Sequence, residues 1–73
     1  MTTEDIADRL VDLGRKIDLL EHRLQYSAGV IASIAADGHT DGDVFTGAVE
    51  HYRHTREAYA QAREERNQLL EEI

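Results

Sequence analysis

The sequence predicts an all-α protein built as an antiparallel two-helix hairpin, and three observations lead to this prediction. The 73 residues contain no proline and are rich in Ala, Leu, Glu and Arg, which favour helix. Apolar residues recur at alternating steps of three and four along two long segments, which is the spacing of a coiled-coil-like helix. A short stretch that contains Gly38 and Gly42 separates these segments.

The first segment predicts a helix over about residues 3–36. Thr2 or Thr3 is the expected N-cap, and Glu4 and Asp5 are favourable in the first turn because they oppose the positive end of the helix dipole. Gly38 suits the left-handed position that ends a helix. The apolar positions form one seam with a single polar member: Ile6, Leu10, Leu13, Ile17, Leu20, Leu24, Ser27, Ile31 and Ile34.

The connection over about residues 37–42 resembles a calcium loop at first sight. Asp37, Asp41 and Gly42 match the twelve-residue EF-hand pattern, but His39 replaces a carboxylate, and Ala48 stands where a bidentate Glu should close the site. We therefore interpret the stretch as a turn. The T-x-x-D spacing of Thr40 and Asp43 predicts a capping box at the start of the next helix.

The second segment predicts a helix over about residues 43–73. Antiparallel folding would pair Ile6 with Ile73 and Ile34 with Phe45. The flanking charges then place Arg9 near Glu72, Lys16 near Glu65, and Glu21 near Arg56 or Arg63. The second seam is more polar than the first, with Thr55 and Arg66 among its members: Phe45, Ala48, Tyr52, Thr55, Tyr59, Ala62, Arg66, Leu69 and Ile73.

Chemical motifs are sparse. The chain has no cysteine, no glycine-rich phosphate loop and no nucleophile motif, so we expect neither catalytic residues nor a cofactor. Glu50, His54 and Glu57 share one helix face, as metal ligands on helices do. The predicted register places them on the outer face, where a solvated polar surface is the simpler interpretation and an ion bridging two chains is the alternative.

Charge and hydropathy restrict the class of partner. The net charge of −7 opposes binding to nucleic acid and favours either solubility or a basic partner. The longest mainly apolar run, residues 28–36, is about half the length of a membrane span, and the first ten residues lack the pattern of a secretory signal. These features predict a soluble, cytoplasmic protein that does not contact membranes.

A second apolar stripe predicts self-association. Leu19, Tyr26 and Val30 lie outside the first seam at steps of seven and four, and small residues such as Ala32 lie nearby. One hairpin buries little apolar surface, so we expect at least a homodimer, most simply a four-helix bundle. The predicted function is a non-enzymatic protein–protein interaction module, and the alternative is a metal-binding helical protein.

Overall fold

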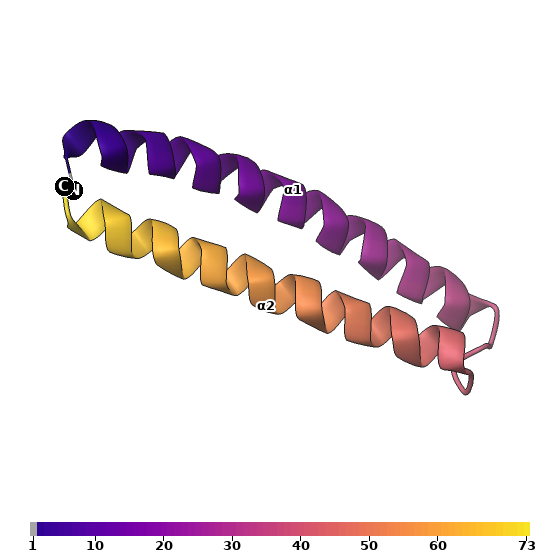
Figure 1. The fold of residues 1–73 in the computed structure, drawn as a ribbon. Coiled ribbons are helices and arrows are strands. Elements are labelled where there is room, and N and C mark those ends of the chain that lie inside the picture. Colours follow the sequence, from indigo (N-terminus) through magenta and orange to yellow (C-terminus); the bar gives the residue numbers. More distant parts are fainter. Residues whose placement is uncertain (1) are drawn as a thin grey trace.

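The computed structural model describes residues 2–73 as two helices joined by a short turn. Helix α1 spans Thr3–Ala36 and helix α2 spans Asp43–Glu71. The helices run antiparallel and pack against each other, with both ends of the chain at one end of the molecule and the turn at the other (Figure 1). No strand occurs within residues 2–73, so the prediction of an all-α hairpin is confirmed.

Helix α1 begins with a capping box. The backbone N–H of Asp5 donates to the Thr2 hydroxyl at 3.2 Å, and the backbone N–H of Thr2 donates to the Asp5 carboxylate at 3.4 Å. Two N–H groups at the helix start are satisfied in this way, and the carboxylate of Asp5 lies near the positive end of the helix dipole.

Helix α1 ends in a Schellman motif centred on Gly38. This glycine has a φ of 78°, a left-handed conformation that costs little without a Cβ atom. The backbone N–H groups of Gly38 and His39 donate to the carbonyls of Ala35 and Ile34 at 3.0 and 3.1 Å. These two bonds satisfy carbonyls that the helix end would otherwise leave free.

Helix α2 begins differently from the sequence prediction. Gly42 is its N-cap and provides no side-chain hydrogen bond, so the predicted capping box between Thr40 and Asp43 is wrong. Thr40 lies in the turn, two residues before the N-cap. A hydroxyl caps a helix from the N-cap position itself, so Thr40 cannot do so.

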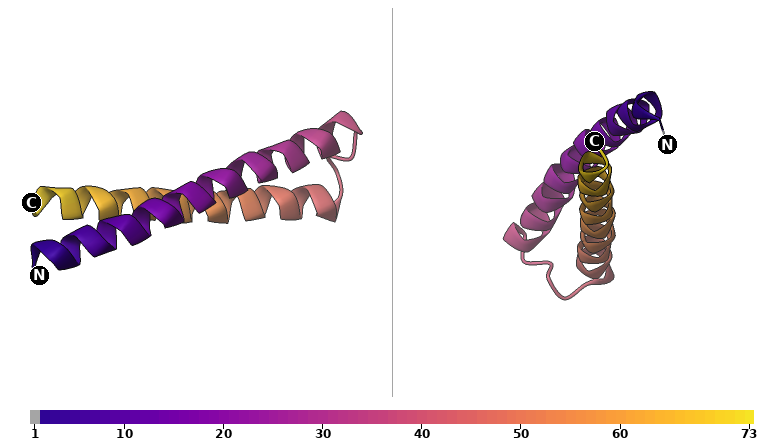
Figure 2. Two further views of the ribbon diagram at one scale, coloured as in Figure 1. Left: turned by 90° about the horizontal axis from the view of Figure 1, so that it is seen from above. Right: turned by 90° about the vertical axis from the view of Figure 1, so that its left-hand side faces the viewer.

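The core lies along the two predicted seams and is concentrated away from the turn. Every buried residue among residues 2–73 belongs to a seam: Ile6, Leu13, Ile17, Leu20, Ser27, Thr55, Ala62 and Leu69. The apolar seam residues nearer the turn, including Ile31, Ile34 and Phe45, are only half-buried. Figure 2 shows the helices crossing at an angle. Ile73, predicted to cover Ile6, is exposed because α2 ends at Glu71.

Polar contacts between the helices differ in part from those predicted. Arg9 forms an ion pair with Glu65, one heptad away from the predicted partner Glu72. Glu72 is the C-cap of α2, whereas the half-buried Glu65 lies within the helix and lines one hollow together with Arg9 and Lys16. The ion pair is exposed and therefore helps to select the register more than it stabilises the fold.

A second polar contact joins Glu21 to Tyr59. The Tyr59 hydroxyl donates to the Glu21 carboxylate at 2.8 Å, and the Arg63 guanidinium lies 5.5 Å from the centroid of the Tyr59 ring. The sequence predicted Arg63 or Arg56 as the direct partner of Glu21. In the part of the chain that the structure describes, the phenol of Tyr59 takes that place, and Arg63 contacts the ring instead.

Within residues 2–73, neither the length nor the apolar character of any helix suffices to cross a bilayer.

We predict that Gly38→Ala lowers the free energy of unfolding by about 1 kcal/mol, because alanine is strained at positive φ. Gly47→Ala is the matched control: it lies in the interior of α2, where an added Cβ meets no atom within 4 Å. That control should raise stability by about 0.5–1 kcal/mol. Urea unfolding of both variants measures the difference, and equal effects would contradict the assigned helix end.

We also predict that Tyr59 ionises at a higher pH than a free tyrosine side chain. The hydrogen bond to Glu21, followed by burial and the charge of Glu21, raises the pKa of Tyr59 above 10.0. The neutral phenol is favoured in the folded state, so the stabilisation is present below pH 10.0 and is lost as the pH rises through the higher folded value. In an NMR titration, Glu21→Gln should lower the pKa of Tyr59, whereas Glu50→Gln should leave it unchanged. Identical titrations of all three proteins would refute the contact.

Candidate functional site

One face of α1 exposes large apolar side chains from the middle of the helix toward the turn. Leu19 is 51% exposed and Tyr26 is 76% exposed, while Val30 is half-buried. Their spacing of seven and four places all three on the same side of the helix. The predicted stripe is therefore present on the surface of the isolated hairpin.

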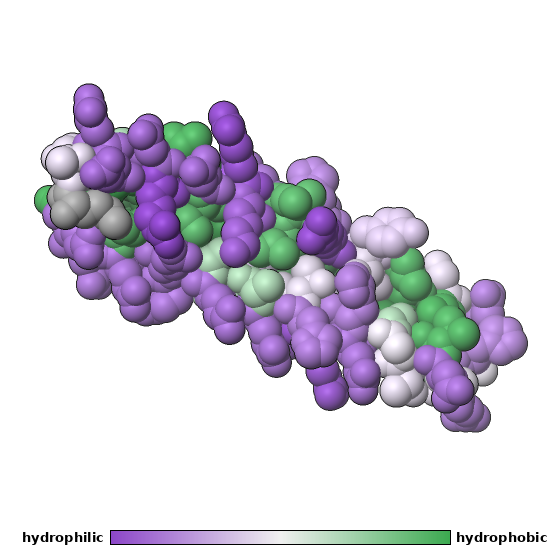
Figure 3. Space-filling model, viewed as in Figure 1, coloured by the Kyte–Doolittle hydropathy of each residue, from purple (hydrophilic) through white to green (hydrophobic). Residues whose placement is uncertain are grey.

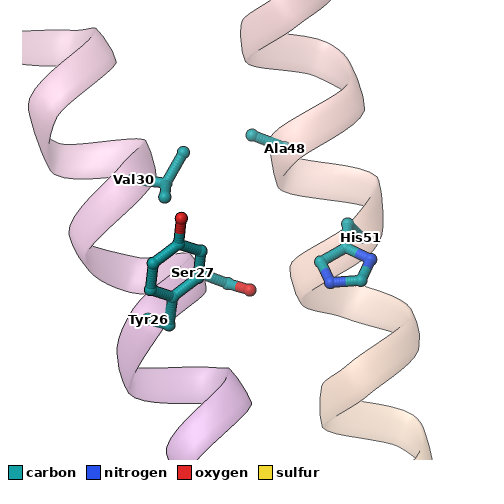
Figure 4. A pocket seen from close by; sticks show the side chains of 5 residues that line it. All are labelled: Tyr26, Ser27, Val30, Ala48 and His51. Atoms are coloured by element: carbon teal, nitrogen blue, oxygen red, sulfur yellow. The ribbon is translucent and has the colours of Figure 1, made fainter.

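Helix α2 extends this face across the groove between the helices. A shallow hollow of about 120 Å³ is lined by Tyr26, Ser27 and Val30 from α1 and by Ala48 and His51 from α2. In Figure 4 the Ser27 side chain points across toward α2. Val44 is 74% exposed. Ala48 follows Val44 by four residues and His51 follows Ala48 by three, so all three lie on the same side of α2.

We call this surface the turn-side face and define it as Leu19, Tyr26, Val30, Val44, Ala48 and His51. The spacing of apolar residues had predicted its α1 members, whereas its α2 members Val44, Ala48 and His51 were not expected on this face. The signal was available in their helical spacing, but the contribution of α2 depends on how the two helices are rotated against each other. Figure 3 shows apolar atoms exposed near the turn end of the molecule, among polar side chains.

A second hollow flanks Tyr26 on the outer side of α1. It has a volume of about 470 Å³, is open to solvent, and is lined in part by Gly29, Ser33 and Asp37. An added Cβ at Gly29 would meet no atom within 4 Å, which shows that this surface is open. Tyr26 thus lies between this hollow and the hollow that separates the two helices.

Ala32 lies on a different face of α1. It follows Val30 by two residues, which corresponds to a rotation of about 200° around the helix axis. Ala32 is exposed and lines neither hollow beside Tyr26. Ser33 and Gly29 are the small residues that border the turn-side face instead.

The hairpin has more surface than a compact protein of its mass. Its accessible surface is 5563 Å², whereas a compact monomer of 8.3 kDa exposes about 4,600 Å². The molecule measures 53 × 14 × 13 Å, and this rod shape accounts for the excess.

Metal ligands do not converge within one chain. Glu50, His54 and Glu57 are all exposed on α2. Among residues 2–73, no group of three or more His, Asp or Glu side chains lies close enough together to hold a metal ion. An ion at these three residues would therefore need further ligands from a second chain.

The hollow between the helices contains hydroxyl groups but no arrangement for nucleophilic catalysis among the residues that line it. Ser27 is buried there beside the exposed His51. The hydroxyl of the nearby Thr55 donates to the carbonyl of His51 at 2.9 Å. No carboxylate borders the hollow to orient the imidazole, as a catalytic triad requires.

Comparison with protein-family models, curated proteins and solved structures found no match to the chain. The assignment of a function therefore depends on the surface of the hairpin.

We predict that His54→Gln changes the free energy of unfolding by less than about 0.5 kcal/mol, as expected for an exposed side chain. Zinc should leave the melting temperature of both proteins unchanged. A rise with zinc in the wild type that His54→Gln abolishes would instead support metal binding at Glu50, His54 and Glu57.

Proposed function

We propose that this protein is a non-enzymatic protein–protein interaction module whose working unit is a homodimer, most simply a four-helix bundle. The observation that carries the proposal is the exposed turn-side face, where Leu19, Tyr26 and Val44 are each more than half exposed. Val44 adjoins the part of the seam nearest the turn, where Phe45 is only half-buried, whereas Leu19 lies beside the buried Leu20. A partner on this face would bury the apolar side chains that the hairpin leaves exposed.

The energetics favour such a partner. Fully burying a large apolar side chain contributes about 1.5–3 kcal/mol, whereas a core of this size supplies about 3–5 kcal/mol in all. Covering Leu19, Tyr26 and Val44 would therefore contribute stabilisation comparable to that of the isolated hairpin. Association and folding should consequently be coupled, so that stability rises with protein concentration.

The charge of the chain selects the class of partner. A net charge of −7 repels the phosphates of nucleic acid, and bases and acids alternate along both helices without forming a basic face. The proposed partner is a protein surface with an apolar centre, and a second copy of the chain provides one.

We predict that Leu19→Glu combined with Tyr26→Glu converts the dimer into a monomer and lowers its melting temperature. The matched control is Val11→Glu combined with Leu70→Glu, at positions that are 54% and 52% exposed and lie outside the turn-side face. The control adds the same charge at two exposed apolar positions. Sedimentation equilibrium and thermal unfolding at several concentrations measure both effects.

Two results would contradict the proposal of self-association. One is a wild-type protein that is a well-folded monomer at micromolar concentration, with a melting temperature independent of concentration. The other is a control pair that dissociates the dimer as effectively as the substitutions at Leu19 and Tyr26.

A further inference from the structure

The outward side of α1 carries an ordered row of side chains that extends beyond the apolar stripe. At about 100° per residue, eight positions of residues 3–37 fall within a sector of about 60°, and the two nearest the N-terminus are Asp8 and Asp12. The six that follow them form this row. Asp37, the last of them, is the C-cap and keeps a right-handed helical backbone with φ −79° and ψ −3°, so it continues the row. The row consists of Arg15, Leu19, Tyr26, Val30, Ser33 and Asp37.

Arg15 and Asp37 stand equally far from Tyr26 along the chain, one on each side. When a helix packs antiparallel against a second copy of itself, facing residues are those equally distant from the two-fold axis. An axis at Tyr26 would therefore bring Arg15 of each chain opposite Asp37 of the other. The same axis brings Leu19 opposite Ser33, which lines the open hollow of about 470 Å³. It also brings Val30 opposite the exposed His22.

We propose that two copies of this chain dimerise through α1 packed antiparallel on α1, with the two-fold axis at Tyr26, two symmetric Arg15–Asp37 contacts, and Leu19 seated over the hollow beside Ser33. This proposal rests on the proposed function, because it specifies the geometry of the self-association suggested there.

Neighbouring registers are less favourable. Moving the axis to a point between Leu24 and Gln25 would pair Leu19 with Val30. It would also place Asp12 opposite Asp37, which sets two carboxylates against each other in both symmetric contacts. Moving it to Ala28 would place the apolar Leu19 opposite Asp37. The Tyr26 register is the one of these three that pairs opposite charges, and flanking charges commonly select the register of packed helices.

Arg15 and Asp37 are available for contacts between chains. Neither side chain takes part in an ion pair or a side-chain hydrogen bond within residues 2–73, where the one ion pair joins Arg9 to Glu65. Arg15 and Asp37 lie on one helix about 33 Å apart at 1.5 Å per residue, so they cannot pair within a chain.

Charge reversal tests the register. Arg15→Glu and Asp37→Arg each place like charges across both symmetric contacts, and we expect each to raise the dimer Kd about tenfold. The double variant R15E/D37R keeps the net charge of the wild type and should restore its Kd. An equimolar mixture of the two single variants should form heterodimers in preference to either homodimer, because both contacts are then complementary.

Controls separate the register from effects of net charge and of folding. Arg53→Glu and Glu57→Arg, at exposed positions of α2, change the net charge by the same amounts as the two test variants and should leave Kd unchanged. Both test positions are exposed, and an arginine at the C-terminal end of a helix is favourable to the dipole, so circular dichroism should show folded variants. Sedimentation equilibrium gives Kd, and native mass spectrometry of mixed labelled chains counts heterodimers.

The outcomes distinguish the two proposals. A monomeric wild-type protein would overturn both self-association and this register. A dimeric wild type whose Kd is insensitive to both single reversals, or whose mixed variants form heterodimers only at the statistical frequency, would overturn the register and leave the proposed function in place. Weakening by each single variant, recovery in the double variant and preferred heterodimers would establish it.

Discussion

The constraint on which the whole structure depends is that a hairpin of two helices can bury one stripe from each helix. Helix α1 contributes four buried apolar residues to the core, Ile6, Leu13, Ile17 and Leu20. Helix α2 contributes two, Ala62 and Leu69. This burial is concentrated in the half that contains the chain ends, and the helices cross at an angle (Figure 2). The remaining apolar surface is exposed because two helices provide no third element to cover it.

The turn-side face follows directly from that constraint. Val44 borders the part of the seam nearest the turn, where Phe45 is only half-buried. Tyr26 and Val30 line two hollows that a second helix can fill. Polar contacts such as Tyr59 with Glu21 and Arg9 with Glu65 define how the two helices are aligned. The interaction surface is thus a consequence of the same packing that holds the hairpin together.

The turn is specified by backbone geometry more than by side-chain chemistry. Gly38 adopts the left-handed conformation that lets two N–H groups cap α1, and Gly42 starts α2 without a capping side chain. The acidic residues of the segment, which gave it the outline of a calcium loop, take no part in these hydrogen bonds. Carboxylates near helix starts are explained by the helix dipole without a bound ion.

The sequence by itself determined that the chain folds as two helices and which residues form the seams, because a strict spacing of three and four leaves a single stripe to bury. It also located Leu19, Tyr26 and Val30 as apolar residues outside the seam. The tertiary structure decided which flank of α2 adjoins them, and so added Val44 and His51, because side-chain neighbours across a groove depend on the rotation of both helices. It likewise decided the partners of Arg9 and Glu21, since long flexible side chains can reach several positions that spacing alone cannot distinguish.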